Sequence, residues 1–272
     1  MAYKDILLHL DNSPSCPARV ELAMSIARTH GAHIKGLFVV SHSYYNPRNA
    51  RGVTEAALKL EALFTEKARQ TGISAEWLYV DWSVIGVSIT EIIDLYAYYS
   101  DLVIISQPDL GSQNVGTPAD LPERLGLGSG RPLLVVPYAG NFSSAVERVM
   151  VAWKAGRESS RVVNDAMPIL EKARHVSIVT ISTSGSDNDS TERDVQQLCS
   201  YLSRHQVTAV HDQVRTSPNF PLGDVLLNHA CEQKMDLLAM GAFAPTRRGN
   251  FVLGPIAKHL MSQMTLPVLI SH

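Results

Sequence analysis

The chain has 272 residues, of which 45% are hydrophobic and 18% charged, and its formal net charge is −2. This composition is typical of a soluble globular protein, and the near-neutral charge disfavours a nucleic-acid or membrane-surface function. The apolar stretches are strand-sized, far short of the roughly 20 residues that cross a bilayer. The first ten residues lack the pattern of a signal peptide, so we expect a cytoplasmic protein. The length of the chain suggests about two domains.

Strand-sized apolar runs alternate with helically spaced apolar residues in the first half of the chain. Gly31 ends the first predicted helix. The predicted order is strand 6–10, helix 17–29, strand 34–40, polar segment 41–52, helix 54–69, strand 75–82, helix 87–98, a strand after Asp101, a long loop, a short helix, and a strand after Pro132. Strands that alternate with helices predict βαβ units and a parallel sheet with helices on both faces.

The second half repeats this order. The predicted elements are strand 148–153, helix 158–173, strand 176–181, helix 191–205, strand 207–214, helix 222–233, a strand after Asp236, a loop at 242–253, helix 256–264 and a final strand after Pro267. The turn-rich segment 137–144 has the composition of a linker. We therefore predict two domains, 1–141 and 142–272, with the boundary near residue 142.

An internal repeat supports this division. Asp101 and Asp236 each precede a strand-like apolar run, and Pro132 and Pro267 each open a second run. The same offset relates both pairs without a gap, so a duplicated unit explains them better than chance. The predicted fold is α/β, with two tandem doubly wound five-stranded parallel-sheet domains of Rossmann-like type related by a pseudo-two-fold axis.

Several motif-like signals carry no function. The glycine run 126–130 looks like a dinucleotide fingerprint, but it closes a helix and precedes a strand, whereas a true fingerprint opens a helix. Cys16, Cys199 and Cys231 are too scattered for a disulfide framework or a zinc site, and no histidine pair has metal-ligand spacing. No G-x-S-x-G, Walker or H-E-x-x-H motif occurs, so we expect neither a metal site nor an enzyme.

The candidate ligand crevice lies beyond the carboxyl ends of the strands, where the strand order of a doubly wound sheet reverses. In the second half the loops that meet there are 154–157 and 241–254. Glycine permits close approach of the backbone, and the helix that begins after Gly254 presents unpaired amide groups. A phosphate group is therefore the expected ligand.

The second half also carries a family resemblance. The five-strand order given twice, the segment 151–153 with 157–161 behind it, and the closing segments 251–260 and 264–269 resemble the universal stress protein family in its tandem, two-domain form. The resemblance covers essentially the whole chain and implies a five-stranded parallel sheet in each domain. It also implies a nucleotide site, because many members bind ATP through a G-x2-G-x9-G-[ST] loop. Other members bind no nucleotide.

That loop motif is only half kept here. It falls on Gly241, Ala244, Gly254 and Pro255. Ala244 adds a β-carbon where the family's glycine lets phosphate approach, and Pro255 removes a hydroxyl and an amide donor. Lys154 stands where ATP-binding members usually have an aspartate that contacts the nucleoside, and a lysine cannot accept that hydrogen bond.

Two interpretations of the second domain stay open. In the first, ATP or AMP binds, with Mg²⁺ if it is bound, and Lys154, Arg247 and Arg248 supply charge to the phosphates. The residues predicted to bind the nucleotide are Ala152, Trp153, Lys154, Gly241, Ala244, Arg247, Arg248, Gly254, Pro255 and Ile256. In the second, the loop is retained for folding, since proline is common in the first turn of a helix.

The first domain departs further from the motif, because Ser106 and Ala119 stand at the offsets of Gly241 and Gly254. Asp11 begins a turn that resembles the family's aspartate turn, but no phosphate loop lies opposite it. We expect a non-enzymatic stress-response protein that forms a pseudo-dimer within one chain, with its two last strands paired, and a homodimer stays open. The alternatives are a ligand-free scaffold for an unidentified protein partner and a weak ATPase.

Overall fold

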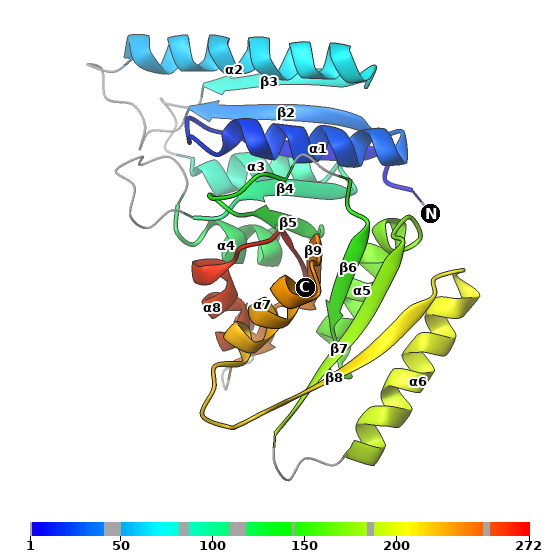
Figure 1. The fold of residues 1–272 in the computed structure, drawn as a ribbon. Helices are drawn as coiled ribbons and strands as arrows, with labels where there is room; N and C mark the ends of the chain where they lie inside the picture. Colours follow the sequence, from blue (N-terminus) through cyan, green and yellow to red (C-terminus); the bar gives the residue numbers. More distant parts are fainter. Residues whose placement is uncertain are drawn as a thin grey trace. The chain divides into compact units, whose positions relative to one another are not determined.

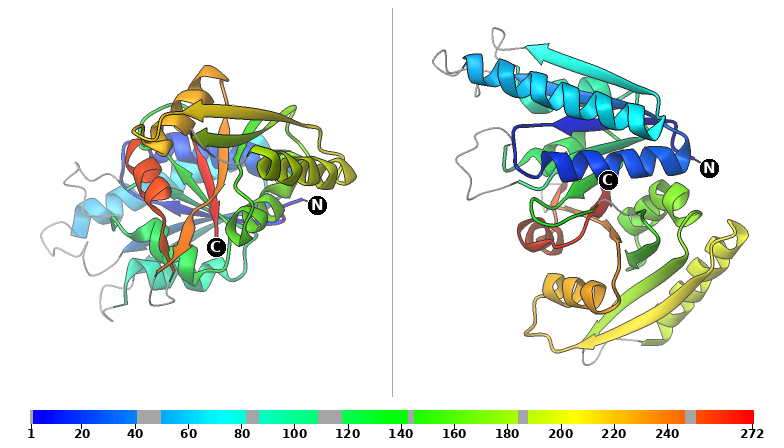
Figure 2. Two further views of the ribbon diagram at one scale, coloured as in Figure 1. Left: turned by 90° about the horizontal axis from the view of Figure 1, so that it is seen from below. Right: turned by 45° about the horizontal axis from the view of Figure 1, so that its top comes forward.

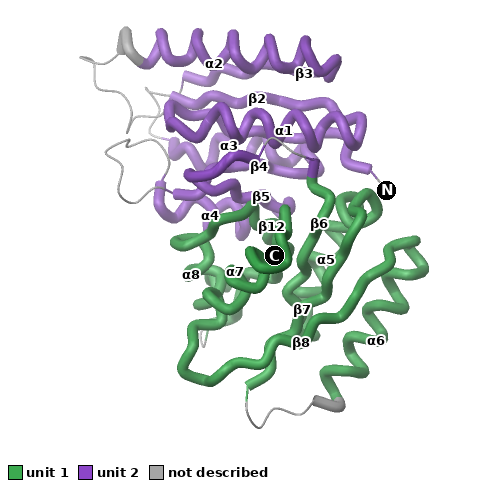
Figure 3. Tube along the Cα trace, in the orientation of Figure 1, with its two compact units in different colours: residues 1, 146–272 green, residues 2–145 purple. Residues whose placement is uncertain are grey.

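The computed structural model of the protein describes residues 2–40, 50–81, 87–108, 118–142, 145–183, 188–246 and 251–272. Its contacts divide the chain into an N-terminal unit, residues 2–145, and a C-terminal unit, residues 146–272 (Figure 3). The boundary predicted near residue 142 lies close to this division.

The N-terminal unit alternates strands and helices in the predicted order (Figure 1). Its elements are β1 (Asp5–Leu10), α1 (Cys16–His30), β2 (His33–Val40), α2 (Ala50–Thr71), β3 (Ala75–Asp81), α3 (Ile89–Ala97), β4 (Leu102–Ser106), α4 (Leu121–Gly128) and β5 (Leu133–Val136). The strands lie in the order β3-β2-β1-β4-β5, and all four neighbouring pairs are parallel.

The C-terminal unit has the same topology. Its elements are β6 (Arg148–Ala152), α5 (Arg157–Leu170), β7 (His175–Thr183), α6 (Asn188–Arg204), β8 (Ala209–Thr216), α7 (Leu222–Glu232), β9 (Leu237–Gly241), β10 (Phe243–Pro245), β11 (Phe251–Leu253), α8 (Pro255–Gln263) and β12 (Val268–Ser271). The strands lie in the order β8-β7-β6-β9-β12 and are again all parallel. The two units are therefore doubly wound five-stranded sheets, as the repeat predicts.

Burial explains why these segments form these elements. The inner strand β4 is buried along its whole length, so it reads as a continuous apolar run. The outer strands β3 and β8 contain no fully buried residue, and each mixes half-buried with exposed positions. In the N-terminal unit α1 packs on α2, and α3 packs on α4. Because the crossovers are right-handed, the pair α1 and α2 covers one face of the sheet and the pair α3 and α4 covers the other (Figure 2).

Helix ends agree with the sequence signals. Gly31 adopts a left-handed conformation with φ +62° and donates its N–H to the last turn of α1, which confirms it as the helix terminus. The glycine run 126–130 closes α4 and leads into β5, and Gly130 also has φ +62°. Its interpretation as a helix terminus is therefore confirmed.

One element differs from the prediction. The segment predicted as a loop at 242–253 contains an antiparallel hairpin, in which Phe243 pairs with Leu253, Ala244 with Val252, and Pro245 with Phe251. The strands have three residues each, too few to show an alternating pattern. Residues 247–250, which connect the two strands in the sequence, lie outside the described residues.

Candidate functional site

The candidate crevice of the C-terminal unit lies at the carboxyl ends of β6 and β9. These strands are neighbours, with Ala152 paired to Met240, so the segments that follow them leave the sheet at the same edge. Ala152 is half-buried at the end of β6, and Gly241 ends β9. This is the edge at which doubly wound sheets bind their ligands.

Gly241 is in close contact with the first turn of α5. A β-carbon at this position would lie 2.7 Å from the carbonyl carbon of Glu158 and 2.8 Å from the amide nitrogen of Ser159. Both atoms belong to backbone, so they cannot move aside as a flexible side chain would. The sheet and α5 approach each other this closely only because residue 241 has no side chain.

The hairpin β10–β11 brings α8 to the same place. The N–H of Gly254 donates to the carbonyl oxygen of Ala242 at 2.7 Å, which closes the base of the hairpin. A β-carbon on Gly254 would lie 3.3 Å from that oxygen and 3.9 Å from the β-carbon of Ala244. Gly241 and its neighbour Ala242 therefore hold the N-terminal ends of two helices, α5 and α8, at the end of β9.

Both helices begin without a side-chain cap. Gly156 precedes α5 and Gly254 precedes α8, and neither can offer an oxygen to the first amides of its helix. Pro255 opens α8 without an N–H, so the first free amide of that helix belongs to Ile256. Two helix N-termini with partial positive charge thus lie at one edge of the sheet, which favours an anion.

Side-chain charge adds to this potential. Lys154 is exposed in the loop between β6 and α5. Arg157, the first residue of α5, places its guanidinium carbon 5.3 Å from the centre of the Phe251 ring. Arg247 and Arg248, both predicted to contact phosphate, lie outside the described residues. Lys154 and Arg157 are therefore the cations that the described structure places at this edge.

An aromatic group below Arg157 was not predicted from the sequence. The His272 ring lies edge-on to Phe243 and Phe251, at 5.1 and 4.7 Å between ring centres. Burial and the nearby Arg157 guanidinium lower the pKa of His272, so this imidazole is neutral near pH 7. The group fixes Arg157 on Phe251. The only sequence signal for Arg157 was its position at the end of the predicted crevice loop 154–157.

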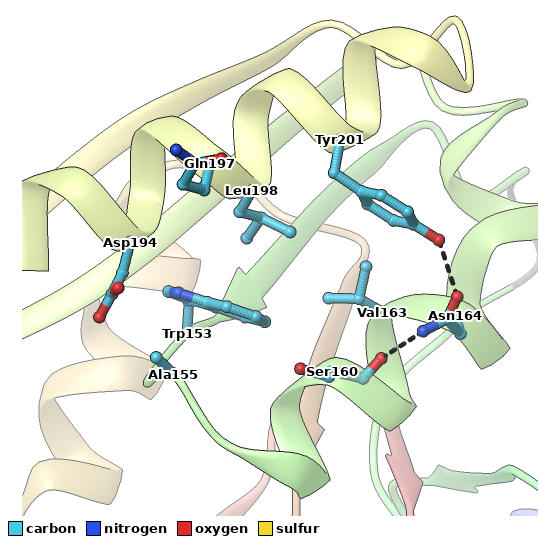
Figure 4. Close-up of a pocket in the computed structure, with 9 residues that line it drawn as sticks. All are labelled: Trp153, Ala155, Ser160, Val163, Asn164, Asp194, Gln197, Leu198 and Tyr201. Carbon is cyan, nitrogen blue, oxygen red and sulfur yellow. Dashed lines mark hydrogen bonds between the residues drawn. The ribbon is translucent and has the colours of Figure 1, made fainter.

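Trp153 does not face the crevice. Its backbone N–H donates to the Val179 carbonyl oxygen at 2.8 Å, and its side chain lies in a pocket between α5 and α6 (Figure 4). Of the residues predicted to bind a nucleotide, the structure brings Ala152, Lys154, Gly241, Ala244, Gly254, Pro255 and Ile256 to the crevice edge. It places Trp153 beside that edge.

At the corresponding edge of the N-terminal unit, polar side chains of the described residues are paired with other protein groups. Asp11 is 6% exposed, and its Oδ1 lies 2.9 Å from an Arg19 guanidinium nitrogen, while Arg19 also donates to the His9 carbonyl oxygen at 3.1 Å. The side chain of Gln107 accepts the N–H of Tyr138 at 3.2 Å. The carboxylate that resembles the family's nucleoside contact is therefore bound internally.

Two further features concern the part of the chain that the structure describes. No group of three or more His, Cys, Asp or Glu side chains there has the arrangement of a metal site. None of its helices combines the length and the apolar character needed to span a bilayer.

Comparison with solved structures shows the fold. A universal stress protein from Archaeoglobus fulgidus DSM 4304 matches with a TM-score of 0.72 at 16% identity, over 98% of this chain and 95% of that chain. A protein of unknown function from Pseudomonas aeruginosa PAO1 matches at 0.63 and 13%, over 99% and 92%. A P. aeruginosa UCBPP-PA14 protein, named provisionally as a universal stress protein, matches at 0.61 and 15%, over 99% and 93%.

These likenesses extend over both units. No protein-family model and no curated protein matches the sequence. The chain is thus a tandem pair of doubly wound α/β units with a crevice at the strand ends. Its fold is that of universal stress proteins in their two-unit form, which confirms the resemblance seen in the sequence at the level of the fold.

Proposed function

We propose that this protein is a non-enzymatic cytoplasmic stress-response protein whose C-terminal unit senses an adenine nucleotide, ATP or AMP, by binding its phosphates. The observation that carries the proposal is that the N-termini of α5 and α8, both without a side-chain cap, lie near the end of β9 beside exposed Lys154. Backbone amides, helix dipoles and a lysine are the groups that proteins use for phosphate. The stress-response role and the adenine base rest on the shared fold.

Within this proposal each residue has a limited part. Lys154 contributes its charge, the amide of Ile256 is a free donor, and Arg247 and Arg248 are expected to add charge. The Gly254 amide is committed to Ala242, and Pro255 has none, so α8 offers fewer donors than an ordinary helix. Mg²⁺ would enter with the phosphates of ATP. We expect an affinity weaker than that of a full phosphate loop by one to several decades, at about 1–3 kcal/mol per missing donor.

A ligand-free interaction scaffold is the second candidate, and one observation favours it. Gly241 is required by the contact with α5, and the Gly254 amide closes the hairpin. Both glycines of the half-kept motif therefore have structural reasons to persist without any nucleotide. In that case the function would lie in an unidentified protein partner.

Ligand recovery and calorimetry separate the two candidates. The full chain, purified without added nucleotide, should release AMP or ATP that mass spectrometry detects, and titration with ATP and Mg²⁺ should give a binding isotherm. Lys154→Ala should weaken that binding, whereas Lys172→Ala, a matched change at the opposite end of α5, should not. Repeated recovery of no nucleotide together with flat calorimetry would exclude sensing and favour the scaffold.

Restoring the motif tests the reason for weak binding. Pro255→Ala returns the amide alone, and Pro255→Ser returns the amide and the hydroxyl. If donors limit the affinity, each change should tighten ATP binding, and Pro255→Ser should exceed Pro255→Ala by about tenfold for the added hydrogen bond. Ala244→Gly should act in the same direction. Unchanged affinity in all three variants would show that donors in this loop do not bind phosphate.

A further inference from the structure

A pocket of about 490 Å³ lies between α5 and α6 in the C-terminal unit, beside the anion crevice (Figure 4). This volume falls in the range of small-molecule sites, roughly 300–1,000 Å³. The Trp153 indole lies across one end, and the side chains of Val163 and Leu198 supply apolar wall from the two helices. A flat apolar ring system would therefore find a complementary surface.

The Trp153 indole nitrogen carries a hydrogen-bond donor that is not used. Nε1 is buried, and no acceptor for it is found among the described residues. An indole N–H can only donate, so it needs an acceptor to be satisfied. In Figure 4 the nitrogen-bearing edge of the indole faces the side of the pocket from which Asp194 projects. A ligand at this end meets a donor and a carboxylate side by side.

The opposite end of the pocket is internally satisfied. Tyr201 donates its hydroxyl to the Asn164 side-chain oxygen at 2.8 Å, and the Asn164 amide nitrogen donates to the Ser160 carbonyl oxygen at 2.8 Å. These bonds are drawn in Figure 4. Tyr201 and Asn164 are thus already paired, whereas the Trp153 N–H at the other end is an unused donor in the described part of the chain.

The charge of the lining excludes the kind of ligand expected in the crevice. Among the described residues that line the pocket, none is Lys, Arg or His, and Asp194 contributes a carboxylate. A phosphate or carboxylate would meet like charge and no counterion there. A neutral or cationic ligand with a donor for Asp194 fits instead.

We propose that this pocket binds a planar amino-heteroaromatic compound without phosphate. A ring nitrogen accepts the Trp153 N–H, the neighbouring exocyclic amino group donates to Asp194, and the ring packs between Val163 and Leu198. A ring nitrogen beside an amino group presents an acceptor next to a donor, which complements an N–H next to a carboxylate. The proposal does not depend on the proposed nucleotide function, because its polar contacts, Trp153 and Asp194, are not among the groups proposed to hold phosphate.

The test uses 4-aminoquinazoline, a bicyclic compound with this edge, and the full chain labelled with ¹⁵N-tryptophan. Loss of one indole signal in Trp153→Phe assigns the Trp153 N–H. On titration that signal should shift and saturate while the other tryptophan signals stay in place. Quinazoline, which keeps the ring nitrogen but lacks the amino group, should bind at least about tenfold more weakly.

Variants then test the two polar contacts. Asp194→Asn, on the exposed rim of α6, should weaken 4-aminoquinazoline about tenfold or more, and Trp153→Phe should weaken it comparably. Glu192→Gln, a matched change on α6 that does not line the pocket, should leave the affinity unchanged. If Trp153→Phe fails to fold, Asp194→Asn alone decides.

Inorganic triphosphate provides the second arm. It should not move the Trp153 signal, and Lys154→Ala should not change the affinity for 4-aminoquinazoline. A Trp153 signal that does not respond to 4-aminoquinazoline, equal binding of the two quinazolines, or an unchanged affinity in Asp194→Asn would each overturn the proposal. Failure of triphosphate or ATP to bind would count against the crevice only.

Discussion

Asp101 and Asp236 make the same pair of hydrogen bonds in the two units. Oδ2 of Asp101 accepts the backbone N–H groups of Lys4 and Asp5 at 2.7 and 3.1 Å. Oδ2 of Asp236 accepts the two amides that open β6 at 2.9 and 2.8 Å. Each aspartate thereby ties the start of the fourth strand of its unit to the start of the first. The sequence repeat thus preserves a structural clamp.

Removing that clamp should destabilise its own unit. We expect Asp236→Ala to lower the free energy of unfolding by about 2–4 kcal/mol, because two charge-assisted hydrogen bonds to backbone are lost. Urea unfolding of the full chain measures the loss, and hydrogen exchange should show faster exchange at the amides of Glu147 and Arg148. Glu232→Ala, at an exposed position near the end of α7, is the control. An equal loss in both variants would show that the carboxylate contributes nothing specific.

The contact between Gly241 and α5 predicts an asymmetric response to alanine. Gly241→Ala should cost about 2–3 kcal/mol, because the new β-carbon would clash with the backbone of Glu158 and Ser159. Gly156→Ala is the matched change, since its β-carbon would have only the Lys154 carbonyl oxygen nearby, at 3.7 Å. It should cost less than about 1 kcal/mol, as expected for an N-cap glycine. The difference in unfolding free energy between the variants is the measurement, and a difference near zero would refute the close contact.

The buried pair of Asp11 and Arg19 predicts a pH-dependent stability. Burial raises the pKa of Asp11, but Arg19, His9 and the Ser13 hydroxyl outweigh this and hold the pKa well below its usual range. The folded-state pKa therefore lies below that of the unfolded chain, about 3.9, so the stabilisation is complete above pH 4 and is lost as pH falls further. Arg19→Met should cost about 3–5 kcal/mol at pH 7, because it leaves a buried carboxylate without its guanidinium.

Urea unfolding of Arg19→Met at two pH values provides the check. The loss relative to the unmodified chain should shrink between pH 7 and pH 3, since the uncompensated carboxyl can then take up a proton. Equal losses at both pH values would mean that Arg19 acts through packing and not through its charge.

The environment of Asp94 predicts that stability depends on pH in the opposite direction. Burial first, and the nearby Glu91 second, raise the pKa of Asp94 to about 6. A β-carbon on Gly128 would lie 2.7 Å from its Oδ2, and Oδ1 is buried without a hydrogen-bond partner in the described residues. Because the folded-state pKa exceeds that of the unfolded chain, the N-terminal unit should lose stability as pH rises from about 4 to about 6.

Asp94→Asn should remove this loss. The variant should show a higher denaturation midpoint than the unmodified chain at pH 7.5 and no advantage at pH 3.5. Asp120→Asn changes an exposed carboxylate that already pairs with Arg124, and it should give no gain at either pH. An Asp94→Asn midpoint that is unchanged at pH 7.5 would show that the carboxyl is well solvated.

The element order could be predicted because buried parallel strands leave uninterrupted apolar runs, such as Leu102–Ser106, and helices leave a longer period. The hairpin β10–β11 could not, since strands of three residues show no period. Its Gly, Pro and Asn residues indicate a turn but not the pairing around it. Tertiary contact with the rest of the unit decides that segment.

The candidate site could be predicted only in part, for a similar reason. Gly241 and Gly254 stand out in the sequence, but the contact with Glu158 and the bond to Ala242 exist only after folding. Arg157 was missed because its aromatic partner, Phe251, is distant along the chain. Trp153 shares the side of its strand with Val151, yet the sequence does not show that α5 and α6 leave a pocket over that side.

The ion pair between Asp11 and Arg19 means that the N-terminal unit carries its own counterion. A guanidinium from α1 pairs with the carboxylate, so Asp11 can accept a hydrogen bond from a nucleoside hydroxyl only if this ion pair opens. Any ligand of the N-terminal unit would therefore have to compete with a partner that the chain itself supplies.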